Sequence, residues 1–154
     1  MKSPLAVEWQ CLPFDELSAC QTHALLALRQ QVFILEQQCF YQDADSLDSV
    51  AFHLLGTDKA GRVIATARLI PPAHRYPEVA IGRVATEMSV RGKGVGGELM
   101  LQALRWADQL FPNIDIKISA QTRLAGFYTQ LGFETLGQPY DDEGIEHIDM
   151  LLHR

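Results

Sequence analysis

The fold and the chemistry depend most on the segment Arg91-Gly92-Lys93-Gly94-Val95-Gly96-Gly97. Before it, the apolar run Val79–Thr86 predicts a strand, and after it apolar residues at helical spacing predict a long helix that ends at Phe111. Glycines let the backbone approach an anion closely, and the first N–H groups of a helix have no partner within the helix. With the charges of Arg91 and Lys93, this strand–turn–helix unit predicts a cradle for a pyrophosphate.

The spacing of the glycines argues against a nucleotide as the ligand. Gly92, Gly94 and Gly97 match the dinucleotide pattern G-x-G-x-x-G, but the residues from Glu87 to Arg91 separate the strand from the first glycine. In a dinucleotide site that glycine follows the strand directly. A P-loop is excluded because Glu98 stands where that motif needs its lysine. A nucleotide-binding protein is therefore the weakest interpretation of the turn.

The rest of the chain predicts a mixed α/β (α+β) fold. Strands are expected at residues 6–11, 50–55, 63–69, 114–119, 133–136 and 147–152, and helices at residues 18–29 and 122–131. Ser18 and Gln21 have the spacing of a capping box, and Gly132 suits the end of the last helix. Residues 37–49 and 137–146 are polar and are expected to be loops. The strand–turn–helix–strand order in the middle predicts one parallel strand pair with a right-handed crossover.

Composition restricts the class of protein. Of the 154 residues 47% are hydrophobic and 21% charged, which suits a single folded domain over residues 1–154. The net charge of -6 argues against nucleic acid as a partner, because an acidic surface repels phosphates. Three cysteines without C-x-x-C spacing argue against a disulfide framework and a zinc site, so no metal is expected. No apolar run suits a signal sequence or a membrane span, which predicts a cytoplasmic protein without a membrane partner.

Three motifs resemble the GNAT N-acyltransferases. Arg91-x-x-Gly94-x-Gly96 matches the R/Q-x-x-G-x-G/A signature with which that family grips the pyrophosphate of acyl-CoA. Phe127-Tyr128 followed by Leu131-Gly132-Phe133 is similar to the family's second cofactor segment, and residues 81–86 stand where its fourth strand lies beside the pantetheine. The resemblance covers essentially the whole chain. It implies a mostly antiparallel twisted sheet with helices on both faces and one parallel pair splayed at the acyl-CoA site.

Further residues resemble one branch of that family, the ElaA-like proteins. They are Arg29-x-x-Val32-Phe33-x-x-Glu36-Gln37, Cys39-x-Tyr41-x-Asp43-x-Asp45, Ile81-Gly82-Arg83-Val84 and Gly144-Ile145-x-His147. The resemblance does not identify the acceptor. We expect a small-molecule or peptide amine, and the sequence leaves a homodimer open.

The resemblance also implies a role for each residue of the site. The backbone of Val84, Ala85 and Thr86 would pair with the pantetheine and polarise the thioester carbonyl. Tyr128 matches the family's general acid for the leaving thiolate. Gln121, where many members have asparagine, and Phe127 would lie along the cofactor, although an aromatic residue on a short helix more often packs in the core. The pyrophosphate of acetyl-CoA would be held by Arg91, Gly92, Lys93, Gly94, Val95, Gly96 and Gly97.

The predicted reaction is transfer of the acetyl group of acetyl-CoA to a primary amine by direct attack through a tetrahedral intermediate. The general base is open: many relatives have a glutamate on the fourth strand where this chain has Ala80, and Glu36, Glu78, His53, His147 or a water chain could serve. Two alternatives to this reaction remain. One is an autoinducer-synthase-like acyltransferase, a class that lacks so complete a glycine turn, and the other is a non-catalytic acyl-CoA sensor, which does not need Tyr128.

Two acidic groups are predicted to flank the side from which the acceptor approaches. Both groups could be solvated loops; if either lines the site, its field would concentrate cationic amines. The groups are Glu36, Asp43, Asp45 and Asp48 after the first helix, and Asp141, Asp142 and Glu143 before the last strand.

Overall fold

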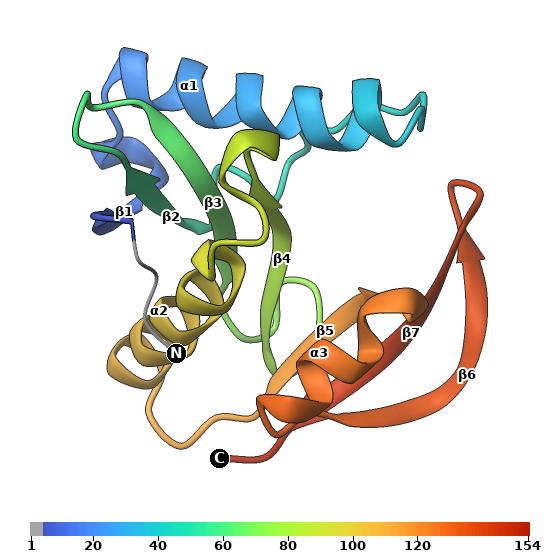
Figure 1. Cartoon of the computed structure of the whole chain (residues 1–154). Helices are drawn as coiled ribbons and strands as arrows, with labels where there is room; N and C mark the ends of the chain where they lie inside the picture. The colour runs from blue at the N-terminus through green and yellow to red at the C-terminus, as the bar shows by residue number, and fades with distance from the viewer. Residues whose placement is uncertain (1–4) are drawn as a thin grey trace.

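The computed structural model describes residues 5–154, which form a seven-stranded sheet in the order β1-β2-β3-β4-β5-β7-β6 (Figure 1). Neighbouring strands are antiparallel except β4 and β5, which pair in parallel. The predicted fold class, a mostly antiparallel sheet with one parallel pair, is therefore confirmed.

The strands are β1 (Glu8–Pro13), β2 (Phe52–Thr57), β3 (Val63–Ile70), β4 (Val79–Thr86), β5 (Ile116–Gln121), β6 (Glu134–Asp142) and β7 (Ile145–Leu152). The α-helices are α1 (Ala19–Arg29), α2 (Val95–Leu110) and α3 (Ala125–Gln130). Most predicted elements are confirmed within two or three residues at each end.

Helix α1 begins at the predicted capping box. The Gln21 N–H donates to Ser18 Oγ at 3.0 Å, and the Ser18 N–H donates to Gln21 Oε1 at 2.9 Å. After Arg29 the helix widens into a π-helical segment, Gln30–Glu36. This extension brings Phe33 and Glu36 over the end of β4, beside Val84 and Thr86. Wide helical turns of this kind often occur at functional sites.

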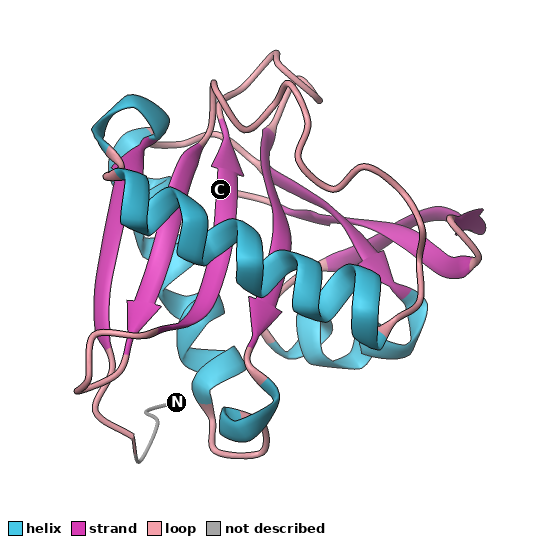
Figure 2. Cartoon of the chain, turned by 90° about the horizontal axis from the view of Figure 1, so that it is seen from above, coloured by secondary structure: helices cyan, strands magenta, loops and turns pink. Residues whose placement is uncertain are grey.

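Helices cover both faces of the first half of the sheet, so β3 is buried along nearly its whole length (Figures 1 and 2). Leu28 of α1 and Val32 of the π-helical segment pack against Ala85. Helix α2 presents its predicted apolar face, including Leu99, Met100 and Ala103, to the main core. Helix α3 lies against β5, the second strand of the parallel pair (Figure 1).

The sheet opens at its parallel pair. In the part of the chain that the structure describes, β4 and β5 are paired only at Val79 with Ile116 and at Ala80 with Lys117. Figure 1 shows the two strands diverging beyond this point. The opening leaves one backbone edge of β4 without a strand partner, so its N–H and C=O groups from residue 81 onward are available to a ligand.

A β-bulge sits on β4 at the opening. Thr66 on β3 pairs with Ala85 and Arg68 pairs with Gly82, so Arg83 and Val84 both lie opposite the single residue Ala67. Arg83 has a φ of 49°, in the left-handed region that non-glycine residues rarely adopt. Bulges re-aim the backbone and side chains of a strand and are common next to active sites.

The predicted polar loop at residues 137–146 is wrong. Strand β6 runs to Asp142 and β7 starts at Ile145, with Tyr140 paired to His147 and Asp142 to Ile145 in a long hairpin. Every residue of β6 is exposed, so the apolar alternation that marks a strand in sequence is missing there. The hairpin extends beyond the body of the sheet (Figure 1).

Candidate functional site

Two cavities meet where β4 and β5 separate. The turn cavity lies against the glycine turn, and its wall includes Glu36, Thr86, Arg91, Gly96 and Phe127. The hairpin cavity lies against the β6–β7 hairpin, and its wall includes Cys39, Tyr41, Arg75, Asp142, Glu143 and His147. Six residues line both: Phe33, Gln37, Val84, Gln121, Leu124 and Tyr128. A ligand in one cavity therefore reaches a ligand in the other beside Val84 and Tyr128.

The glycine turn has the backbone shape expected of an anion cradle. Gly92 and Gly94 have φ values of 76° and 83°, which side chains resist. Gly94 is the N-cap of α2, so the N–H groups of the following residues lie at the positive end of a four-turn helix. Val95 and Gly97 are buried in the core, which fixes this end of the helix.

Gly96 stands at the point where this helix start meets the turn cavity. A Cβ atom built on Gly96 would have no heavy atom within 4 Å, apart from its own helix and chain neighbours. No other part of the protein fills the space beside Gly96, so this space is open to a ligand. This open space next to unpaired helical N–H groups fits a pyrophosphate.

Arg91 holds two parts of the turn cavity together. Its guanidinium donates to the carbonyl oxygen of Thr86 at 2.8 Å and forms an ion pair with Glu36 Oε1 at 2.7 Å. Glu36 is thus engaged with the turn and does not face the hairpin cavity. Lys93, the second predicted cation, lies on the exposed part of the same turn.

Tyr128 is buried at the junction of the two cavities. Its ring packs edge-on against Phe127 and Phe133, with centroid distances of 5.1 and 6.0 Å. Burial raises the pKa of the Tyr128 phenol to about 12, so the hydroxyl keeps its proton through the physiological range. Phe127 packs against this ring and also lines the turn cavity.

A pair of amides crosses the junction. Gln121 Nε2, at the end of β5, donates to Gln37 Oε1, just after the π-helical segment, at 3.2 Å. Arg123 Nε donates in turn to Gln121 Oε1 at 3.1 Å. Gln121 was predicted for the site from the resemblance, whereas Gln37 was quoted only as a feature of the branch.

The four candidate bases lie in different places. His147 lines the hairpin cavity, and Glu36 lines the turn cavity. Glu78 and His53 line neither cavity. His53 is 1% exposed, its Nε2 lies 2.9 Å from the Asp48 carbonyl oxygen, and burial lowers its pKa, so it is a neutral structural residue.

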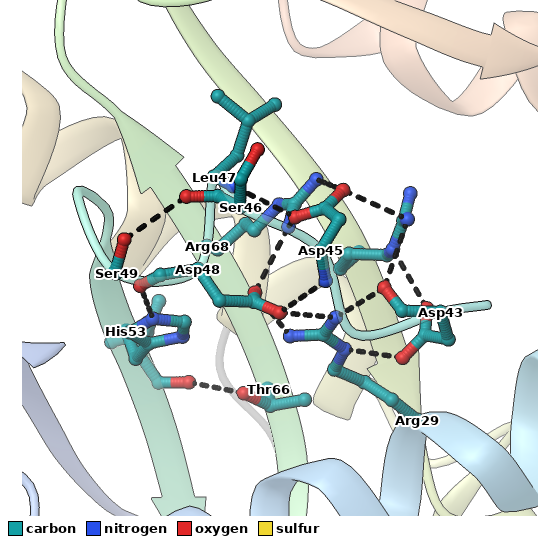
Figure 3. Close-up of polar contacts among 12 residues, drawn as sticks. Arg29, Asp43, Asp45, Ser46, Leu47, Asp48, Ser49, His53, Thr66 and Arg68 are labelled. Atoms are coloured by element: carbon teal, nitrogen blue, oxygen red, sulfur yellow. Dashed lines mark hydrogen bonds and ion pairs between the residues drawn. The ribbon is translucent and has the colours of Figure 1, made fainter.

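The acidic group after the first helix is part of a buried arginine–aspartate network (Figure 3). Arg29 pairs with Asp43 and Asp48, each at 2.7 Å, and Arg68 pairs with Asp45 at 2.6 Å and Asp48 at 2.9 Å. Arg83, on the β4 bulge, pairs with Asp43 at 2.7 Å and Asp45 at 3.4 Å. The three aspartates are therefore neutralised, and the prediction that they attract cationic amines is wrong.

The network holds the segment after α1 against β3 and β4. Arg29 and Arg68 are each 1% exposed, and a buried charge is tolerated only when it is paired. Burial would raise the pKa of Asp48, but the hydrogen bond and charge of Arg29 outweigh it and lower this pKa to about 2. Since Arg83 belongs to the same network, the ion pairs also fix the bulge that carries Val84 to the junction.

Comparison with known proteins identifies the family. The model of the acetyltransferase (GNAT) domain matches residues 19–154. The chain belongs to the GNAT acyltransferase family. Members of this family use acyl-CoA as the acyl donor, so the chain is an acyltransferase by family.

Three relatives show which branch of the GNAT family the chain resembles. ElaA of Escherichia coli is 38% identical over 146 residues, with 94% of this chain and 95% of ElaA covered, and its crystal structure superimposes with a TM-score of 0.90. An acyl-CoA N-acyltransferase from Pseudomonas aeruginosa is 36% identical, with a TM-score of 0.91 over 96% of this chain and 99% of that one. A UPF0039 protein of Synechocystis sp. is 43% identical, and the match covers 96% of each chain. The predicted ElaA-like branch is confirmed.

Two further observations concern membrane-spanning helices and the cysteines. In residues 5–154 no helix is both long and apolar enough to cross a membrane. The cysteines Cys11, Cys20 and Cys39 are all free thiols.

Proposed function

We propose that this GNAT protein transfers the acetyl group of acetyl-CoA to a primary amine by direct attack. The observation that carries the proposal is the junction of the two cavities at Val84 and Tyr128. A donor held on the glycine turn and an acceptor entering beside the hairpin would meet there, and holding two reactants together lowers the barrier to their reaction.

The turn cavity suits acyl-CoA in its charge and its backbone. The pyrophosphate would lie on the start of α2 beside Gly96, with Arg91 and Lys93 as cations. The pantetheine arm would run along the unpaired edge of β4, where Val84, Ala85 and Thr86 offer backbone groups. A backbone N–H at the bulge would stabilise the oxyanion as the amine attacks the thioester.

Tyr128 would assist the departure of the thiolate as a hydrogen-bond donor. Its pKa of about 12 lies well above the ordinary pKa of a thiol, about 8.5. Complete proton transfer from the phenol to the thiolate would therefore cost about 5 kcal/mol. A hydrogen bond that strengthens as charge develops on sulfur avoids this cost. The thiolate then takes the second proton lost by the amine nitrogen and leaves as the free thiol.

The acceptor would enter through the hairpin cavity as a cationic amine. Asp142 and Glu143, at the hairpin tip, form part of the wall of this cavity. Their carboxylates would attract an ammonium group, whereas Arg75 in the same wall would favour an acceptor that also carries a carboxylate. Amino acids, peptides and polyamines are therefore the acceptors to test first.

A thiol-release assay tests the proposal. Wild-type protein would be mixed with acetyl-CoA and each member of a panel of diamines, polyamines, amino acids and dipeptides, and free CoA would be measured together with the mass of the product. We expect release of one thiol for each acetylated amine, and none from Gly96→Val. Stoichiometric binding of acetyl-CoA without thiol release for any amine would favour an acyl-CoA sensor instead.

A further inference from the structure

We propose that His147 is the general base that removes a proton from the acceptor amine, with Nε2 as the proton acceptor. This inference rests on the acetyl transfer proposed above and supplies the residue that the resemblance to the family leaves open. It is needed because Ala80 stands where many relatives have a glutamate, and a buried methyl group cannot accept a proton.

The position of His147 separates it from the other candidates. It lines the hairpin cavity, whose wall also includes Val84 and Tyr128. Glu36 is held by Arg91 on the other side of the junction, at 2.7 Å. Among the candidate bases named from the sequence, all of which lie in the described residues, His147 is the one that shares a cavity with an incoming acceptor and not with the pyrophosphate.

The hydrogen bonds of His147 leave Nε2 as the proton acceptor of the neutral ring. Nδ1 lies 2.7 Å from the carbonyl oxygen of Ile145. A carbonyl can only accept a hydrogen bond, so in the neutral imidazole Nδ1 carries the proton and Nε2 carries the lone pair. The backbone of the hairpin therefore selects the tautomer that a general base requires.

The ring is also fixed in orientation. It stacks on Tyr140 of β6, with centroids 6.2 Å apart and an angle of 25° between the planes. The Tyr140 hydroxyl is anchored in turn, because it donates to Asp149 Oδ1 at 2.7 Å and contacts Ser119 Oγ. A base that is held by a backbone carbonyl on one side and a tethered aromatic ring on the other needs little reorganisation before it acts.

Titratable groups face His147 from β5, β6, β7 and the neighbouring loops. Strand β5 places Gln121 opposite it, and β6 places Tyr140 opposite it. Most charged groups on these elements are carboxylates, which favour an ammonium substrate. The titratable groups are Asp141, Asp142 and Glu143 at the hairpin tip, Glu146 and Asp149 on β7, Lys117 on β5, and Cys39, Tyr41 and Arg75 in the loops.

The proposed step balances in protons and bonds. Nε2 of His147 takes one proton from the ammonium and later releases it to solvent. The free amine forms a C–N bond to the thioester carbonyl carbon, and the C–S bond breaks. The thiolate, stabilised by a hydrogen bond from Tyr128, takes the second proton lost from the amine nitrogen. The products are one amide, one thiol and one proton.

The test compares pH profiles of kcat/KM for wild type and His147→Gln, with the best amine of the panel as acceptor. At pH 7 we expect about 10²-fold lower kcat/KM in the variant, because general-base catalysis typically contributes at least this much. The wild-type profile should show an acid limb between about pH 5 and pH 8, where imidazoles titrate, and the variant should lack it. The difference in kcat/KM between wild type and His147→Gln should shrink toward about pH 10, where more of the amine is already deprotonated.

Two further measurements separate the possible failures. The affinity for acetyl-CoA should be the same in wild type and His147→Gln, because His147 lies outside the turn cavity. His23→Gln, an exposed change on α1, is the matched control and should leave the whole profile unchanged. A variant that keeps wild-type kcat/KM and the acid limb overturns the assignment of His147. Absence of turnover in wild type overturns the proposed acetyl transfer itself.

Discussion

The buried arginine–aspartate network gives a quantitative prediction for Asp48→Asn. The wild-type carboxylate accepts from Arg29 at 2.7 Å, from Arg68 at 2.9 Å and from the Asp45 N–H at 3.1 Å. Asparagine has nearly the same shape but no charge, so the change removes the charge while it disturbs packing little. It leaves two buried guanidinium groups that share one fewer negative partner.

The expected cost follows from the pKa of Asp48. Folding lowers this pKa from an ordinary 3.8 to about 2. By linkage, this difference contributes about 2 kcal/mol to the free energy of unfolding at neutral pH. Breaking a buried ion pair costs about 3–5 kcal/mol when the other partner stays behind. We therefore expect Asp48→Asn to lower the free energy of unfolding by about 2–5 kcal/mol at pH 7.

The pH dependence distinguishes charge from packing. Because the folded pKa is depressed, the contribution of the carboxylate is fully present above about pH 4 and is lost as the pH falls toward 2. Urea unfolding of wild type and Asp48→Asn, measured between pH 7 and pH 2.5, should show a difference that shrinks below about pH 4. A difference that stays constant across this range would refute the electrostatic account of the network.

Three other changes test separate parts of the structure. In Gly56→Ala the new Cβ atom would lie 2.6 Å from the Trp9 ring. A urea titration should therefore show a free energy of unfolding about 1–3 kcal/mol lower than in wild type. No loss of stability would show that the Trp9 ring moves freely. Tyr128→Phe should lower kcat by about 10²-fold with unchanged acetyl-CoA affinity, and an unchanged kcat would assign Tyr128 to packing. The double change Asp142→Asn with Glu143→Gln should raise KM for a diamine at low salt but not at high salt. An unchanged KM at low salt would show that the hairpin tip does not bind the acceptor.

The sequence was most informative where local chemistry decides the structure. The turn from Arg91 to Gly97 was predicted from glycines, cations and a helix start, all of which are visible over a few residues. Helix α1 began at the predicted Ser18 cap for the same reason. The bounds of β4 were predicted because most residues of the run Val79–Thr86 are apolar, and its first three residues are buried.

The sequence was least informative where distant segments decide the structure. Asp43, Asp45 and Asp48 have the composition of a solvated loop, and only the approach of arginines from α1, β3 and β4 makes them a buried network. The hairpin of β6 is exposed along its length, so no hydrophobic period marked it. His147 could be named as a candidate base, but the cavity that it lines depends on the position of that hairpin.

Calorimetric titration with acetyl-CoA tests the central claim most directly, with Gly96→Val and Gly126→Val as a matched pair. Both glycines are helical, and a Cβ atom at either would meet no other part of the protein, so both variants should fold. Gly96 lines the turn cavity, whereas Gly126 is exposed on α3 and does not. We predict that wild type and Gly126→Val bind acetyl-CoA equally and that Gly96→Val binds at least about tenfold more weakly, a loss of about 1.4 kcal/mol or more. Equal affinity in Gly96→Val, or no binding by wild type, would contradict the assignment of the glycine turn to acyl-CoA.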